Sequence, residues 1–303
     1  MNEQGYLDLV RRVLEEGEDR EGRNGATKSL FGERLIFDLK SRFPLLTTKR
    51  VYWRGIVEEL LWFLRGSTNV RELQEKGVHI WDGNSTREFL DSVGLKYVSE
   101  GSIGKGYGWQ WRNFDGTIAY SPEDRMINHF IKTTDGVDQL RYILQELRDN
   151  PHGRRAVLCA WNPTQLREMA LPPCHFVYNF YVGQRGLACQ MVMRSCDVGA
   201  GLPFNIASTA LLTHIISRVL GLSVDKIVIV TGDTHLYAQH FESAKAQIDR
   251  VPYELPQLVI KKAAPTKESS IDDLLTWIEE LTYDDFEIRE YTHHPPLKYE
   301  MVV

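Results

Sequence analysis

The chain has 303 residues, of which 43% are hydrophobic and 25% are charged, and its formal net charge is −5. This composition is sufficient for a sizeable hydrophobic core and differs from that of a disordered chain. A net negative charge argues against a long nucleic acid as the main partner, because phosphate backbones select strongly basic surfaces. It does not exclude a single nucleotide, which needs only a local cluster of arginines.

The chain shows no internal repeat, no low-complexity linker and no apolar run long enough to span a bilayer. Its N-terminal stretch is charged and amphipathic, which differs from a signal peptide. The four cysteines contain no C-x-x-C pair, and no metal-ligand spacing is present. We therefore expect a single domain over residues 1–303, with reduced thiols, no metal, and a cytoplasmic location (the host cytoplasm for a phage-encoded chain).

In the first half of the chain, apolar spacing predicts helices at residues 5–16 and at about 51–66. Residues 28–46 are predicted to form strands and turns. The stretch 100–116 is rich in glycine and aromatic residues, and we interpret it as a binding loop.

In the second half, helices and strands are predicted to alternate. The helices are expected at 139–148, at 206–220 and shortly after residue 234, and residues 264–272 are expected to form a polar surface segment. The strands are expected at 155–161, 176–182, 187–193 and 227–230, on β-branched and aromatic content. The alternation indicates an α/β (α+β) fold with a mixed sheet.

Cys174 is the candidate nucleophile. It follows two prolines, which present it rigidly at the start of a predicted strand, although an unpaired cysteine is more often a packed small hydrophobe. The adjacent His175 suggests the Cys–His dyad of a cysteine hydrolase. Adjacent residues of a strand point to opposite faces, however, so a hydrolase would need a different histidine.

Glu59 is the candidate proton-transfer group. On the predicted helix it shares one stripe with Ile56 and Phe63, so its carboxyl lies on the apolar face and its pKa is expected to be raised. The alternative is a partly exposed glutamate at the edge of the stripe. Glu58, four residues after Arg54, is interpreted as half of an ordinary solvated ion pair.

Several polar residues are candidates for binding a nucleotide. Guanidinium groups match phosphate geometry, and the candidate arginines are Arg23, Arg154, Arg155 and Arg194, the last followed by the hydroxyl of Ser195. Asn205 has an amide that can read a pyrimidine edge, or it caps the predicted helix. Asp197, His235 and Tyr237 are either ligand-binding residues or, respectively, a turn aspartate, a helix-start histidine and a packed tyrosine.

Four blocks of sequence together resemble the thymidylate synthase superfamily, and the resemblance extends from residue 6 to residue 303. The blocks are residues 43–50 (FPLLTTKR), 59–64 (ELLWFL), 80–82 (IWD) and 172–175 (PPCH). The resemblance implies a large mixed sheet flanked by helices, and a homodimer in which the sheets of two subunits pack back to back. It also implies catalysis by Cys174, with proton transfers organised by Glu59, Tyr107 and His175.

In this family the cysteine adds to C6 of a pyrimidine nucleotide, which makes C5 nucleophilic towards the methylene group of the cosubstrate 5,10-methylenetetrahydrofolate. The implied nucleotide-binding residues are Arg23, Arg194 and Ser195 for phosphate, Arg154 and Arg155 for the partner subunit's phosphate, Asn205 for the base, and His235 and Tyr237 for the ribose. The implied folate-binding residues are Trp81, Asn84, Asp197, Gly201 and Phe204, with the C-terminal Val303 closing over the ligands.

The chain departs from synthases at positions that we interpret as specificity determinants. Met193 replaces Gln, Ala200 replaces Leu and Thr209 replaces Tyr, while Asn205 is retained and favours uracil. The stretches 192–195 and 107–109 are similar to those of pyrimidine nucleotide hydroxymethylases, which add water where a synthase transfers a hydride. Smaller side chains at Ala200 and Thr209 would leave room for that water.

These departures favour conversion of dUMP to 5-hydroxymethyl-dUMP. The alternatives are a thymidylate synthase that makes dTMP and dihydrofolate, and a hydroxymethylase of dCMP or CMP. Alternatives of a different class are a non-catalytic nucleotide-binding relative and a cysteine hydrolase.

Overall fold

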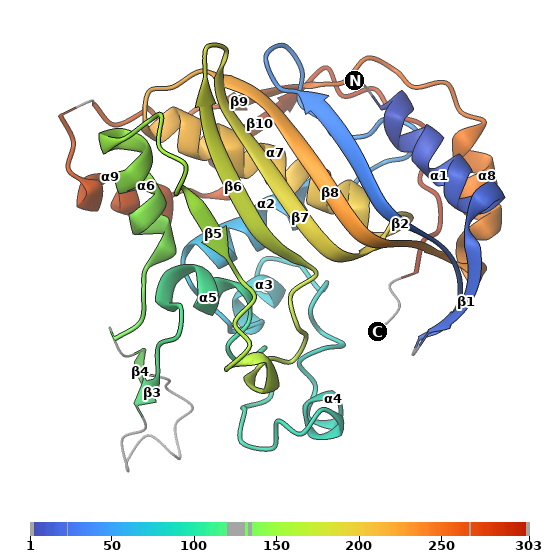
Figure 1. The fold of residues 1–303 in the computed structure, drawn as a ribbon, viewed down its shortest axis with the longest axis horizontal. Helices are drawn as coiled ribbons and strands as arrows, with labels where there is room; N and C mark the ends of the chain where they lie inside the picture. The colour runs from blue at the N-terminus through green and yellow to red at the C-terminus, as the bar shows by residue number, and fades with distance from the viewer. Residues whose placement is uncertain (1–2, 23, 120–130, 133–134, 267, 301–303) are drawn as a thin grey trace.

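The computed structural model describes residues 3–22, 24–119, 131–132, 135–266 and 268–300. Its centre is a six-stranded mixed sheet in the order β1-β2-β8-β7-β6-β5 (Figure 1). The strands are β1 (Glu18–Gly22), β2 (Gly25–Asp38), β5 (Val157–Cys159), β6 (His175–Gly183), β7 (Gly186–Asp197) and β8 (Val224–Tyr237). Only β7 and β8 run parallel, and the other neighbouring pairs are antiparallel. The predicted mixed α/β sheet is confirmed.

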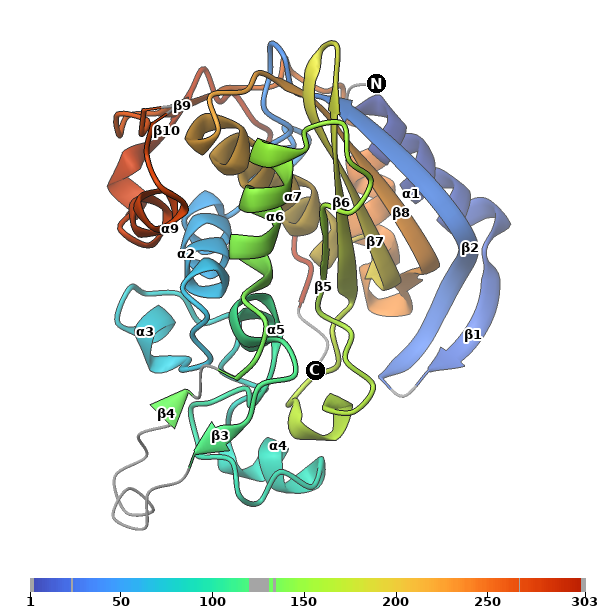
Figure 2. The same ribbon diagram turned by 60° about the vertical axis from the view of Figure 1, so that its left-hand side comes forward.

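Helices pack against one face of this sheet. The α-helices are α1 (Gln4–Glu16), α2 (Trp53–Leu64), α3 (Arg71–Gln74), α4 (Arg87–Ser92), α5 (Tyr107–Asn113), α6 (Gln139–Asp149), α7 (Gly201–Val219), α8 (Phe241–Ile248) and α9 (Ile271–Glu279). Short 3₁₀ helices are η2 (Leu166–Glu168), η3 (Ala238–His240) and η4 (Tyr283–Asp285). Figure 2 shows α7 lying along the sheet with α2 and α6 outside it. The hydrophobic α7 is almost completely enclosed between these layers.

Two small two-stranded sheets lie outside this core. They are formed by β3 (Ile118–Ala119) with β4 (Ile131–Lys132), and by β9 (Gln257–Ile260) with β10 (Phe286–Arg289). In the described part of the chain, no helix is both long enough and apolar enough to cross a membrane.

Strands β6, β7 and β8 are longer than the sequence predicts, whereas β5 is shorter than the strand expected at 155–161. β8 does not stop at Val230, as expected, but runs on to Tyr237, and the turn and helix predicted from Thr231 are wrong at this point. The reason is its neighbour β2, which pairs with β8 in one register from Thr27↔Tyr237 to Asp38↔Lys226. Long-range pairing therefore overrides the local turn preference of the Thr-Gly-Asp-Thr sequence.

Two helix starts also differ from the prediction. The expected binding loop at 100–116 contains α5, whose Tyr107 and Trp111 are buried against the aromatic ring of Phe63. The last long helix, α7, begins at Gly201 instead of residue 206. Asn205 consequently lies inside the first turns of α7, and the interpretation of Asn205 as an N-cap is wrong.

The face of the sheet turned towards the viewer in Figure 1 carries no helix. We call it the outer face and define it by Tyr181, Gln190, Val192, Val228 and Val230. These residues alternate along β6, β7 and β8 with fully buried ones, and the valines are half-buried, whereas Tyr181 is 66% exposed. β-branched side chains without a covering layer are unusual for an isolated sheet, because one apolar face normally packs on another element.

A buried carboxylate fixes the segment that leads into the principal cavity. Glu3 is 1% exposed, and its two carboxylate oxygens accept hydrogen bonds from the backbone N–H and hydroxyl groups of Thr47 and Thr48 at 2.6–2.8 Å. Four donors surround one buried charge, which is the arrangement that compensates its desolvation. Glu3 thereby ties α1 to the segment that continues into Lys49 and Arg50.

We expect Glu3→Ala to destabilise the protein by about 3 kcal/mol, because four buried donors around Thr47 and Thr48 lose their acceptor. Urea denaturation at pH 7 measures this difference. Glu15→Ala, at an exposed position of the same helix, is the matched control and should change the free energy of unfolding by less than about 0.5 kcal/mol. Equal effects of the two substitutions would contradict this role of Glu3.

Candidate active site

One cavity of about 340 Å³ brings together residues from both halves of the chain, a size suited to small-molecule ligands. Its walls come from α2, α5, the first turns of α7, the segment before β6 and the C-terminal segment. The lining residues are Lys49, Arg50, Val51, Tyr52, Glu59, Ile80, Trp81, Asn84, Tyr107, Leu171, Cys174, His175, Ala200, Gly201, Phe204, Asn205, Leu297 and Tyr299.

Cys174 opens into this cavity directly before β6. Its backbone N–H donates a 2.7 Å hydrogen bond to the hydroxyl of Tyr107, and its backbone carbonyl accepts from the N–H of Arg194 at 2.9 Å. Burial raises the pKa of the thiol, and the positive charge of Arg194 opposes that rise. The thiol is therefore held in place, half-buried, beside a cation that stabilises its thiolate form.

The guanidinium of Arg194 also fixes the two prolines that precede the cysteine. It donates to the carbonyl oxygens of Pro172 and Pro173 at 2.8 and 2.9 Å, lies 3.8 Å from the sulfur of Cys174, and packs over the ring of Trp161. The side chain nevertheless stays exposed at its end. It can thus hold the Cys174 segment and still present charge to a ligand.

Glu59 projects from α2 into the cavity, where the indole N–H of Trp81 donates to its carboxyl at 2.8 Å. Burial raises the pKa of Glu59 to about 7, and the bond from Trp81 opposes the rise only in part. A carboxyl that titrates near neutrality can both give and take a proton at physiological pH. The interpretation of its neighbour Glu58 as a solvated group is wrong, because Glu58 is 3% exposed and pairs with Lys76 at 2.8 Å.

His175 and Tyr107 form a stacked pair on the cavity wall. Their rings are 4.3 Å apart and inclined by 18°. Burial lowers the pKa of His175 to about 3, so the imidazole is neutral at physiological pH, and burial raises that of Tyr107 well above its ordinary value. The ring nitrogen Nδ1 of His175 is bonded to the hydroxyl of Tyr178 at 2.9 Å and not to Cys174, an arrangement that offers no support for a cysteine-hydrolase dyad.

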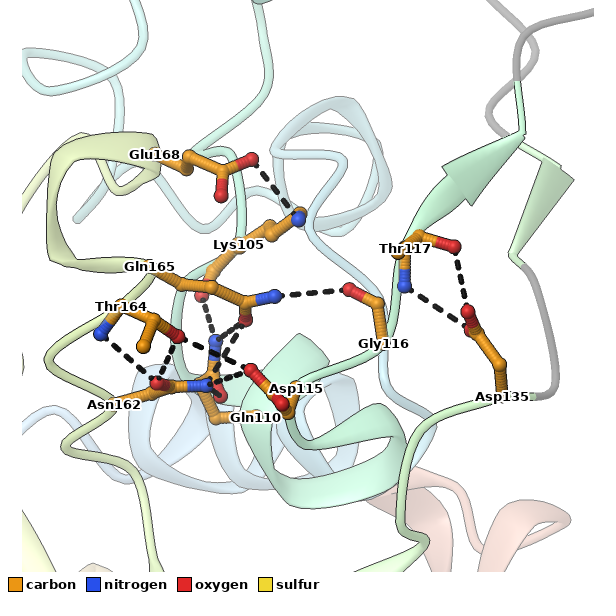
Figure 3. A network of polar contacts seen from close by, with 10 residues as sticks. All are labelled: Lys105, Gln110, Asp115, Gly116, Thr117, Asp135, Asn162, Thr164, Gln165 and Glu168. Atoms are coloured by element: carbon orange, nitrogen blue, oxygen red, sulfur yellow. Dashed lines mark hydrogen bonds and ion pairs between the residues drawn. The ribbon is translucent and has the colours of Figure 1, made fainter.

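A polar network holds the beginning of α5, and with it Tyr107 (Figure 3). Lys105 is 6% exposed, and its ammonium group forms a 2.9 Å ion pair with the carboxylate of Glu168. The backbone N–H of Lys105 also donates a hydrogen bond to the backbone carbonyl of Glu168. Beside this pair, the amides of Gln110 and Gln165 hydrogen-bond each other at 2.8 Å. Gly104 has φ +66°, and a Cβ there would meet the carbonyl oxygen of Glu168 at 2.2 Å.

The first turns of α7 supply another wall of the cavity, with Ala200, Gly201, Phe204 and Asn205 among its lining residues. The turn into this helix is held by Asp197, whose carboxylate accepts from the N–H groups of Gly199 and Ala200 at 2.8 and 3.2 Å. Asp197 thus makes the hydrogen bonds expected of a turn aspartate, and it does not line the cavity.

Ser195, His235 and Tyr237 lie on the sheet, also outside the cavity lining. In the pairing of β7 with β8, Ser195 is opposite Asp233. Nδ1 of His235 is 2.9 Å from the carboxylate of Asp233. His235 is on a strand, so the prediction that it starts a helix is wrong.

Arg154 and Arg155 precede β5 and are exposed, away from the cavity lining. Arg23 and Val303 lie outside the described residues.

Met193 and Thr209 do not line the cavity. Met193 is 3% exposed within the hydrophobic core, and Thr209 is 1% exposed, with its hydroxyl donating to the carbonyl of Asn205 at 2.7 Å. The expected extra room for a water at Thr209 is therefore not present on the cavity wall. Of the small replacements, only Ala200 reaches that wall.

Sequence reasoning missed the contact between Lys49 and the C-terminal segment. The ammonium of Lys49 donates to the carbonyl of Gly199 at 2.6 Å and lies 3.7 Å from the ring centroid of Tyr299. Burial lowers the pKa of Lys49 to about 7. A Cβ at Gly199 would meet the ring of Tyr299 at 2.6 Å, so the tyrosine fills space that a larger residue 199 would occupy. The FPLLTTKR block contained Lys49, but its place in the cavity depends on a contact 250 residues away.

Within the described residues, no three His, Cys, Asp or Glu side chains are grouped to hold a metal ion. A positioned thiol, a carboxyl that titrates near neutrality and a neutral imidazole in one cavity are characteristic of an enzyme that bonds covalently to its substrate.

Comparison with known proteins places this enzyme in a family. The family model described as thymidylate synthase matches residues 4–303. The chain is 44% identical over 299 residues to thymidylate synthase of Homo sapiens, covering 98% of this chain and 90% of that protein. It is 45% identical over 299 residues to thymidylate synthase of human herpesvirus 8, covering 98% of this chain and 83% of that protein. The chain belongs to the thymidylate synthase family, whose members are one-carbon transferases.

One relative with a similar level of identity is a longer protein. The chain is 45% identical over 302 residues to a bifunctional dihydrofolate reductase-thymidylate synthase of Paramecium tetraurelia. The match covers 99% of this chain and 61% of that protein.

We expect Glu59→Gln to change how stability depends on pH. The pKa of this carboxyl is about 7 when folded against 4.5 in the unfolded chain, so the folded state binds more protons between these values. Stability of the wild type therefore falls as pH rises from about 4.5 to 7, by up to about 3 kcal/mol. Gln keeps an acceptor for Trp81 but cannot ionise, so the variant should gain stability over the wild type between pH 5 and pH 8.

Urea denaturation at both pH values measures this difference, with Glu15→Gln as a surface control. A variant that differs from the wild type by the same free energy at pH 5 and pH 8 would contradict the raised pKa of Glu59.

Proposed function

We propose that this protein is a thymidylate synthase, which converts dUMP and 5,10-methylenetetrahydrofolate to dTMP and dihydrofolate. The observation that carries the proposal is the cavity in which Cys174, Glu59, Tyr107 and His175 meet, in a chain that is 43–45% identical to proteins named thymidylate synthase.

The preference for hydroxymethylation is not supported. The relatives are named thymidylate synthases, and two of the three replacements that suggested a different product, Met193 and Thr209, do not line the cavity. Methylation therefore replaces hydroxymethylation as the proposed reaction.

In the proposed reaction, Cys174 attacks C6 of the pyrimidine. Its thiolate is stabilised by Arg194 and its position is fixed by the Tyr107 hydroxyl. Covalent addition divides one difficult step into two easier ones. Glu59 is the group that exchanges protons with the pyrimidine, directly or through water, because its pKa of about 7 suits both directions.

The cavity residues are suited to the two ligands in different ways. The amide of Asn205 offers one donor and one acceptor to the edge of uracil. We assign the phosphate to Arg23, Arg194 and Ser195, and the ribose hydroxyl to His235 and Tyr237. The folate cosubstrate supplies the one-carbon unit and the hydride. Its proposed contacts are Trp81, Asn84, Asp197, Gly201 and Phe204, with Val303 closing over it.

We also propose a homodimer that forms through the outer face. Half-buried valines on an uncovered sheet face need an apolar partner, and a second copy of the same face supplies one with two-fold symmetry. Arg154 and Arg155 are exposed and do not reach the cavity of their own subunit. In a dimer they are proposed to bind the phosphate in the partner subunit's cavity.

The reaction is tested by the mass of the nucleotide formed from dUMP and methylenetetrahydrofolate, with dihydrofolate measured in parallel. We expect dTMP and dihydrofolate in equal amounts, and a loss of at least about 10³-fold in turnover for Cys174→Ser with dUMP binding retained. Cys159→Ser, which changes a cysteine outside the cavity, is the control. Hydroxymethyl-dUMP without dihydrofolate would overturn the proposal.

The shared site is tested by mixing two inactive variants. Arg155→Ala and Cys174→Ser are each expected to be inactive alone. Random exchange of subunits gives about one quarter of sites with both native residues, so part of the activity should return. Activity that stays absent after verified subunit exchange would show that Arg155 does not act across the interface.

A further inference from the structure

Asp233 joins three neighbouring strands of the sheet beside the candidate sugar-binding histidine. It lies on β8, and its carboxylate oxygen Oδ2 accepts from the guanidinium of Arg20 on β1 at 2.8 Å. The other oxygen, Oδ1, accepts from the hydroxyl of Ser29 on β2 at 2.9 Å and is 2.9 Å from Nδ1 of His235. Within the described residues, Nε2 is therefore the nitrogen of His235 that is left for a ligand.

The charges in this network fix the direction of the bond to His235. A guanidinium can only donate, and its ion pair with Oδ2 of Asp233 requires the ionised carboxylate. An ionised carboxylate can only accept a hydrogen bond. The bond between Oδ1 and the imidazole must therefore use a proton on Nδ1, and in the neutral ring Nε2 then carries no proton.

We propose that Asp233 is a positioning residue that holds His235 in the tautomer protonated on Nδ1, so that Nε2 accepts a hydrogen bond from the sugar hydroxyl of the nucleotide. Arg20 and Ser29 hold Asp233 in turn. A deoxyribose 5′-phosphate has a single hydroxyl, at C3′, and that hydroxyl must then be the donor. The tautomer is a property of the free protein, whereas its role in sugar binding rests on the proposed function.

The sheet itself holds the imidazole and the carboxylate together. Asp233 and His235 are two residues apart on β8, so their side chains project from the same face. The ring of Tyr237 meets that of His235 edge-on, with the centroids 5.2 Å apart and the planes inclined by 83°. The side chain of His235 is only 12% exposed. The orientation of the histidine is thus set before a ligand binds.

The first test is ¹H–¹⁵N correlation spectroscopy at pH 8.5 of the full-length protein without ligand. Histidine is labelled with ¹⁵N, and His235→Asn assigns the resonance. We expect the wild type to be neutral and protonated on Nδ1. In Asp233→Asn the amide oxygen should face Arg20, which can only donate, and the NH₂ group should then face His235. The tautomer of this variant should therefore change to protonated Nε2.

Two variants of Arg20 provide the matched controls. Arg20→Met leaves the carboxylate of Asp233 in place and should keep the wild-type tautomer. In the double variant Asp233→Asn/Arg20→Met, the amide oxygen is free to turn to His235, so protonation on Nδ1 should return. A wild type with a proton on Nε2, or an Asp233→Asn variant with an unchanged tautomer, would overturn the inference. A double variant that stays protonated on Nε2 would overturn the role of Arg20.

The second test compares the binding of dUMP with that of its 3′-deoxy-3′-fluoro analogue, whose fluorine cannot donate. The wild type should bind the analogue about tenfold or more weakly, and Asp233→Asn, which presents an N–H, should reduce this ratio to about threefold or less. An unchanged ratio in a variant whose tautomer has changed would overturn the sugar contact. A wild type that shows the expected ratio but makes no dTMP would refute the proposed function alone.

Discussion

The active-site arrangement depends on how the segment before β6 is held. Arg194 binds the carbonyls of Pro172 and Pro173, and the hydroxyl of Tyr107 accepts from the backbone N–H of Cys174. Because prolines have no N–H of their own to offer, the segment depends on these contacts from β7 and α5 for its position. The thiol is consequently placed by two different elements of the core, and its reactivity is tied to the integrity of the sheet.

The electrostatics of the cavity follow from the same burial. Desolvation raises the pKa of Glu59 to about 7 and lowers that of Lys49 to the same region, while it holds His175 neutral. In the described residues, none of these three side chains forms a salt bridge, so their protonation states are sensitive to a ligand that enters the cavity. A charged ligand can therefore shift the protonation of several groups at once.

Much of the fold could be predicted from the sequence, because apolar periodicity is local. The helices at α1, α2 and α6 follow from it, and the strands β6 and β7 follow from their β-branched and aromatic content, which is also local. The full length of β8 and the early start of α7 could not be predicted, because each depends on a partner that is distant in sequence. In the site, the apolar stripe of α2 correctly located Glu59. The same reasoning treated Glu58 as solvated, which is wrong, because reasoning within one helix cannot show that Lys76 approaches Glu58 from another segment. Family resemblance named Thr209 as unusual, but it could not show that this side chain is buried away from the cavity wall.

The contact between Gly199 and Tyr299 has a consequence for sequence variation in this family. A side chain at position 199 and a large ring at position 299 cannot occupy the same space, since a Cβ would lie 2.6 Å from the ring. The two positions are therefore under a joint volume constraint: a substitution that enlarges one is tolerated only when the other becomes smaller. A side chain at position 199 should accordingly be accommodated only together with a smaller residue at position 299, and a paired exchange should be tolerated better than a single one.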